Sequence, residues 1–87
     1  MSSIHFTNVP NSEVGDLIKM LSEKNNEYTG QSVKFHVTVT WPRERFSDVE
    51  LGVVSYNKEE TQRIANELLE RIKLDLPHQD ICVFHKE

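Results

Sequence analysis

A chain of 87 residues supports one hydrophobic core and buries only about 60 to 65% of the surface that its unfolded form exposes. Its 10 Lys and Arg against 14 Asp and Glu give a formal net charge of -4, which disfavours general binding to nucleic-acid phosphates. We expect one domain, residues 1–87. The single Cys and the lack of a signal-peptide pattern predict that it is cytoplasmic. No apolar run is long enough to span a bilayer, so we do not expect it to bind membranes.

The first segment alternates between apolar and polar residues, and we expect a strand over residues 4–9. Pro10 and the following Asn11-Ser12 end this strand and begin a helix. The apolar residues of the helix recur at positions i, i+3, i+4 and i+7, which places them on one stripe: Val14, Leu17, Ile18 and Leu21. A polar stretch over residues 23–30 predicts the end of the helix.

The clearest strand pattern covers residues 33–41, where five apolar residues alternate with four polar ones. One face of this strand is therefore expected in the core. Residues 42–48 predict a turn, and residues 49–56 predict a third strand that is largely apolar on both faces.

A second helix is predicted to begin after Asn57, with Glu60 three residues on in an arrangement close to a capping box. Its buried stripe is expected to consist of Thr61, Ile64, Ala65, Leu68 and Ile72.

Charged residues of this helix have the spacing of favourable ion pairs, Glu59 with Arg63 and Glu67 with Arg71. The sequence Leu76-Pro77 ends the helix. Residues 80–85 predict a fourth strand, in which Cys82 is expected to be a small core residue rather than a reactive thiol.

The order strand, helix, strand, strand, helix, strand predicts an α+β protein of the ferredoxin-like βαββαβ type. Its sheet is expected to be antiparallel, with four strands in the order 4-1-3-2 and both helices on one face. The competing arrangement is a three-stranded α+β domain in which the last segment is irregular.

The sheet face that the helices leave uncovered is the first candidate binding surface. The first two strands offer polar residues there, among them His5, Thr7, His36 and Thr38. Because the third strand is apolar on both faces, some aliphatic side chains must point away from the helices, and we expect Leu51 and Val53 to contribute to an apolar binding patch. The alternative is that neighbouring or C-terminal residues shield them.

The turn between the second and third strands is the second candidate contact site. It combines residue types that are common in interface hot spots: Trp41, Arg43, Arg45 and Phe46. The alternative is that Trp41 continues the core face of the second strand and that Phe46 packs under the turn.

Three of the histidines fall on predicted strands. Since the first and fourth strands are antiparallel neighbours, His5 and His85 are expected side by side on the uncovered face, where a metal or a pH-dependent contact is conceivable. His36 lies two strands away, and no His-x-His or Cys-x-x-Cys spacing supports a metal site. Ordinary polar surface residues are the simpler interpretation.

Two short stretches resemble the RNA recognition motif. Residues 4–10, Ile-His-Phe-Thr-Asn-Val-Pro, resemble its first-strand signature, and residues 51–56 resemble the tail of its third-strand signature. The resemblance implies a sheet that binds single-stranded RNA by stacking bases on aromatic side chains. At the corresponding stacking positions this chain has His5, Leu51 and Val53, and Val49 replaces the leading basic residue of the third strand. Aliphatic residues at these positions suit a protein partner better than bases.

The sequence therefore favours a small non-catalytic module, without a cofactor, that binds another protein or forms a homodimer. It is expected to act through the uncovered sheet face or a sheet edge as a regulator, an adaptor or an inhibitor. RNA binding is the alternative, which the acidic charge and the missing aromatics disfavour. A small enzyme or metal-binding protein that uses the sheet-face histidines is the second alternative, although no spacing brings a nucleophile, a base or metal ligands together.

Overall fold

The computed structural model describes residues 1–28, 34–39 and 44–85. Its elements follow the expected order: β1 (Ser2–Pro10), α1 (Asn11–Glu27), β2 (Lys34–Val39), β3 (Phe46–Val54), α2 (Lys58–Asp75) and β4 (Asp80–His85). The four strands form one sheet in the order β2-β3-β1-β4, and all neighbours are antiparallel. This is the predicted 4-1-3-2 order read from the other edge, so the ferredoxin-like α+β arrangement is confirmed.

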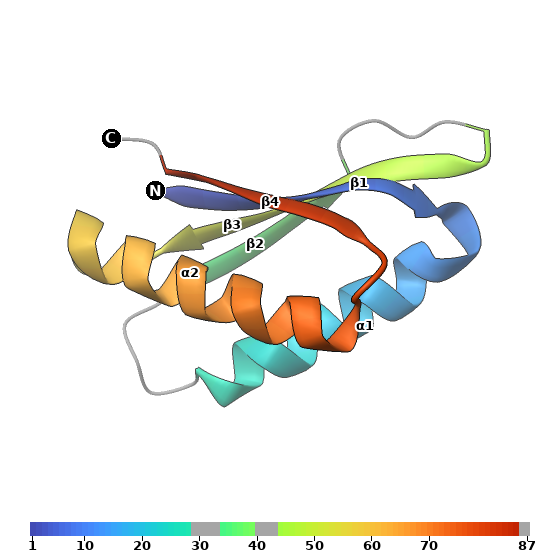
Figure 1. Ribbon diagram of the computed structural model, residues 1–87. Helices are drawn as coiled ribbons and strands as arrows, with labels where there is room; N and C mark the ends of the chain where they lie inside the picture. The colour runs from blue at the N-terminus through green and yellow to red at the C-terminus, as the bar shows by residue number, and fades with distance from the viewer. Residues whose placement is uncertain (29–33, 40–43, 86–87) are drawn as a thin grey trace.

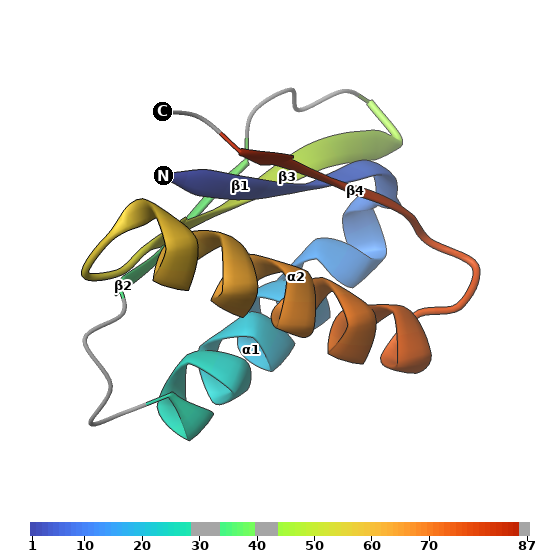
Figure 2. The same ribbon diagram turned by 60° about the vertical axis from the view of Figure 1, so that its left-hand side comes forward.

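Both helices lie beneath the same face of the sheet (Figures 1 and 2). The core forms between this face and the helices because side chains along a strand alternate between its two sides. Ile4 and Phe6 of β1 are fully buried there, as are three residues of β3: Val49, Leu51 and Val53. The helices cover them with Leu17, Leu21, Ile64, Leu68 and Ile72.

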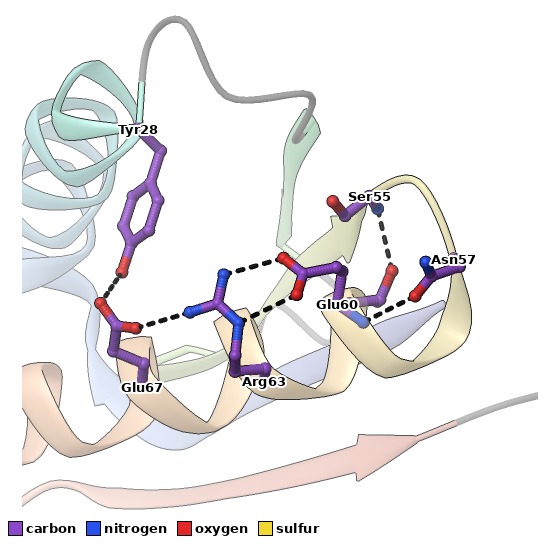
Figure 3. Close-up of polar contacts among 7 residues, drawn as sticks. Tyr28, Ser55, Asn57, Glu60, Arg63 and Glu67 are labelled. Atoms are coloured by element: carbon purple, nitrogen blue, oxygen red, sulfur yellow. Dashed lines mark hydrogen bonds and ion pairs between the residues drawn. The ribbon is translucent and has the colours of Figure 1, made fainter.

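The start of α2 is capped as the sequence predicts. The Asn57 Oδ1 accepts a hydrogen bond of 2.9 Å from the Glu60 backbone N–H, and the Thr61 hydroxyl accepts one of 2.9 Å from the Ser55 N–H (Figure 3). The Asn57 bond satisfies one of the N–H groups in the first turn of α2 that have no partner within the helix. The expected stripe from Thr61 to Ile72 is also confirmed, because all five of its residues are buried.

Helix α1 continues to Glu27 and is longer than predicted. Polar side chains of its last two turns bind α2 instead of ending the helix: Lys24 pairs with Asp75 at 3.1 Å, and Glu27 pairs with Arg71. Tyr28 at the end of α1 is buried and donates a hydrogen bond of 3.1 Å to Glu67. Burial raises the pKa of the Tyr28 hydroxyl above its ordinary value, and the neighbouring Arg71 opposes this shift.

Ion pairs along α2 differ from the two that the spacing predicts. Arg63 binds Glu60 at 2.8 Å and Glu67 at 3.3 Å, so one guanidinium bridges the preceding and the following turn (Figure 3). The Arg63 guanidinium holds the pKa of the Glu60 carboxyl below its usual range. Arg71 pairs with Glu27 of α1 rather than along its own helix. In place of the predicted Glu59–Arg63 and Glu67–Arg71 pairs, Arg63 makes two pairs within α2, and Arg71 joins α2 to α1.

A bulge interrupts β1 between Phe6 and Val9. Asn8 has a positive φ of 56°, and its N–H donates to the Asp48 carboxylate at 3.0 Å. The extra residues turn Val9 back into the core while Thr7 and Asn8 stay exposed. Beyond the bulge, Val9 and Pro10 pair with Ser47 and Phe46, so β3 begins before the predicted residue 49 and ends at Val54.

Among the described residues, neither helix is both long and apolar enough to cross a membrane.

Candidate functional site

The candidate site is the sheet face opposite the helices, which we call the open face. The register between strands places twelve residues on this face: Ser3, His5 and Thr7 of β1; Lys34, His36 and Thr38 of β2; Glu50, Gly52 and Val54 of β3; and Asp80, Cys82 and Phe84 of β4. Neither helix contacts this side of the sheet in either view (Figures 1 and 2).

Two aromatic rings meet on the open face. The His5 and Phe84 rings form an edge-to-face contact, with centroids 4.8 Å apart and planes at 84°. Such a geometry is favourable for aromatic pairs. Phe84 is nevertheless 51% exposed, so its ring is braced on one side and presented to solvent on the other.

Aliphatic side chains extend this aromatic pair at the end of the sheet where β1 begins and β3 and β4 end. Met1 and Val54 are both large and exposed. The Met1 Cε lies 3.4 Å from the position that a Cβ on Gly52 would occupy, so the Met1 side chain crosses the sheet at this glycine. We call Met1, His5, Val54 and Phe84 the open-face patch.

Two small residues, Ser3 and Gly52, lie side by side at the centre of the open face. Ser3 is paired with Gly52 on one side and Phe84 on the other, and it is only 1% exposed. Within the part of the chain that the structure describes, the buried Ser3 hydroxyl has no hydrogen-bond partner. The strand pattern did not single out Met1 or Ser3 as members of a surface site, and it left open which phase of the third and fourth strands exposes Val54 and Phe84.

Leu51 and Val53 do not lie on the open face, which corrects the expectation from the sequence. Both are 0% exposed and point toward the helices, because Leu51 pairs with Ile4 and with Val37 on the core side of the sheet. The apolar character of the open face comes from the open-face patch instead.

The other predicted open-face residues lie where expected. His5, Thr7, His36 and Thr38 all point to this side, and all but the half-buried His5 are exposed. Of the predicted turn site, Arg45 and Phe46 are exposed at the start of β3, so Phe46 does not pack under the turn. Trp41 and Arg43 lie outside the described residues.

Cys82 is exposed on the open face beside His5, so the expectation of a core cysteine is wrong. The strand phase decides this: Ile81 and Val83 face the helices and leave Cys82 and Phe84 on the other side.

The expected neighbourhood of His5 and His85 is also wrong. His85 pairs with Ser2 and lies on the helix side, where its Nδ1 and the Ser2 Oγ are 2.7 Å apart. This spacing suits a nucleophile and its base, but Ser2 is 0% exposed, so a substrate does not reach its hydroxyl. Over residues 1–28, 34–39 and 44–85, no group of three or more His, Cys, Asp or Glu side chains is arranged to hold a metal ion.

The fold and the open face define a small α+β protein with ferredoxin-like strand order and one uncovered sheet face. Comparison of the chain with models of protein families, with curated proteins and with solved structures finds no match.

Proposed function

We propose that this protein is a small non-catalytic binding module whose open face docks onto the open face of a second copy. The observation that carries the proposal is the half-exposed Phe84, held against His5 on a sheet face that no described helix covers. A braced aromatic loses little rotamer freedom when a partner covers it, and aromatic side chains dominate interface hot spots.

The open face is complementary to itself under a two-fold axis that runs along the strands. One row across the sheet consists of His36, Gly52, Ser3 and Phe84. The axis places Phe84 of one copy against His36 of the other and brings the two small central residues together. The flat centre allows close approach, and the flexible Met1 side chain over Gly52 fills the remaining space.

The next row adds charge complementarity. It consists of Thr38, Glu50, His5 and Cys82, so the same axis places Glu50 of each copy against His5 of the other. A carboxylate that faces an imidazole favours this pairing over a shifted register.

The size of the face predicts a weak dimer. Four strands about 4.8 Å apart, with six residues each at about 3.3 Å per residue, cover roughly 400 Å² in projection. This is about half of the roughly 800 Å² per partner in a standard stable interface. We therefore expect dissociation constants in the micromolar range or weaker, which suits a regulated or transient contact.

Sedimentation equilibrium over a wide range of protein concentrations tests the proposal. Wild-type protein is expected to pass from monomer to dimer with increasing concentration. The Phe84→Ser variant is expected to remain monomeric up to a concentration at least about tenfold higher than that at which the wild-type protein dimerises. Leu74→Ser is the matched control, because Leu74 is 84% exposed but lies on α2. A wild-type protein that remains monomeric at millimolar concentration contradicts the proposal.

Single-stranded RNA is the second candidate ligand, favoured by the two neighbouring rings of His5 and Phe84 on the open face. The acidic Glu50 and Asp80 on the same face oppose a phosphate backbone. Fluorescence anisotropy with a mixed-sequence ten-nucleotide RNA at low salt distinguishes RNA binding from docking onto a second copy. Saturable RNA binding that both His5→Ala and Phe84→Ala weaken supports stacking of bases on the open face.

A further inference from the structure

β1 turns into α1 and α2 leads into β4 at the end of the molecule where neither terminus lies (Figures 1 and 2). Residues of these segments line a groove. It consists of two adjoining hollows of about 370 and 320 Å³. Glu13, Leu76 and Gln79 line both hollows and mark their boundary. We call it the helix-end groove.

The β1 bulge creates one wall of this groove. By shifting the register with β3 after Phe6, it leaves the Thr7 and Asn8 side chains exposed along the hollow. The Gln79 side chain crosses from the α2–β4 connection and donates a hydrogen bond of 2.6 Å to the Thr7 carbonyl. The wall is therefore held in place by contacts between distant segments.

The floor of the helix-end groove is apolar. Val9 and Leu17 are buried at its base, and Met20 and Leu76 are half-buried beside them. Two of these residues come from α1, one from β1 and one from the end of α2. Methionine adapts to side chains of different shape, which favours an apolar anchor in this hollow.

The rim of the groove is acidic. Its four carboxylates are Glu13, Asp16, Asp75 and Asp80, and none of the described Lys or Arg residues lines either hollow. Asp75 is neutralised by Lys24 at 3.1 Å, but the other three have no ion-pair partner among the described residues. A cleft with charges of one sign along low-dielectric walls concentrates the negative potential there.

We propose that the helix-end groove binds a segment of a partner polypeptide in which an apolar side chain is followed by Lys or Arg. The apolar side chain occupies the hollow over Leu17 and Met20, and the basic group meets the carboxylates of Glu13 and Asp16. Two adjoining hollows, both open to solvent and both near the lower end of the size range for small-molecule sites, fit successive side chains of an extended peptide. This site shares no residue with the open-face patch, although Thr7 and Asp80 border both the groove and the open face.

Nuclear magnetic resonance titration of ¹⁵N-labelled protein tests the groove, with an acetylated and amidated Leu-Lys-Leu-Arg peptide as the probe. We expect saturable shifts of the Val9, Leu17, Leu76 and Gln79 amide signals. A peptide with Gln in place of both basic residues, and one with Ser in place of both Leu residues, are each expected to bind about tenfold more weakly.

Matched protein variants separate the groove from general attraction between opposite charges. Glu13→Gln with Asp16→Asn is expected to weaken binding about tenfold, because one exposed charge pair contributes up to about fivefold. Glu59→Gln with Glu70→Gln removes the same charge from exposed positions of α2 outside the groove and is expected to change affinity less than twofold. Three results would each overturn the proposal. They are an equal loss of peptide affinity in the two double variants, amide shifts that map to the open-face patch instead of the groove, and no saturable amide shift at millimolar peptide.

Discussion

The Phe84 ring stands edge-on to the His5 ring, with 4.8 Å between the centroids, on the sheet face that the helices leave uncovered. The contact joins β4 to the central strand β1 and fixes the orientation of an aromatic side chain that is half exposed. Binding surfaces commonly combine these two properties, whereas a ring that serves only packing is usually covered.

Truncation of Leu51 tests which face of β3 supports the core. We expect Leu51→Ala to lower the free energy of unfolding by about 2 to 5 kcal/mol, since it leaves a cavity at a fully buried site. Val54→Ala, on the open face of the same strand, is expected to cost less than about 1 kcal/mol. Urea denaturation measures both changes, and a Leu51→Ala protein as stable as Val54→Ala would contradict the placement of Leu51.

Removal of the α2 cap has a defined cost. Asn57→Ala deletes the side-chain acceptor of the Glu60 N–H and is expected to lower the free energy of unfolding by about 1 kcal/mol. Asn66→Ala is the control, because Asn66 is exposed in the interior of α2, where alanine is the better helix former. Thermal denaturation of the two variants should therefore move in opposite directions, and equal shifts would argue against the cap.

The buried hydroxyl of Tyr28 makes stability depend on pH in the alkaline range. Its pKa is raised in the folded protein above the ordinary value of about 10, so folding favours the protonated phenol. This contribution to stability is fully present below about pH 10 and is lost as the pH rises through the folded pKa. In a Tyr56→Phe background, which leaves one phenol, absorbance at 295 nm should show ionisation above about pH 10. A midpoint at or below that value would contradict the burial of Tyr28.

Asn8 has a left-handed backbone conformation, so we expect glycine to be tolerated at this position better than a β-branched residue. Asn8→Gly is expected to change the free energy of unfolding by less than about 1 kcal/mol, because glycine adopts a positive φ without steric cost. Asn8→Val is expected to cost about 1 to 2 kcal/mol or more, because a β-branched residue clashes in this conformation. Chemical denaturation of both variants checks this order, and a valine variant as stable as the glycine variant would show that the bulge rearranges.

The sequence was informative wherever one residue pattern allowed one structure. The spacing of Asn57 and Glu60 and the stripe from Thr61 to Ile72 belong only to a capped amphipathic helix, and α2 has this form. β4 also begins and ends where the alternation predicts.

Prediction failed where two arrangements satisfied the same pattern. Residues 49–56 carry large apolar side chains in both phases of the alternation, so only the register of β3 with Ile4 and Phe6 decides that Leu51 and Val53 enter the core. In the same way, residues 23–27 are polar enough for a loop, and only the ion pairs of Lys24 and Glu27 with α2 show why they remain helical. The open-face patch depends on the phase of β4 beside β1, which local sequence does not contain.

The most direct test of open-face docking is a charge exchange between His5 and Glu50, measured by sedimentation equilibrium. His5→Glu and Glu50→Lys are each expected to weaken self-association. The first places two carboxylates against each other across the two-fold axis, and the second removes the carboxylate that faces the His5 imidazole. An equimolar mixture of the two variants should associate at least as strongly as the wild-type protein, since Glu at position 5 then faces Lys at position 50. A mixture that associates no better than the separate variants would contradict the face-to-face dimer.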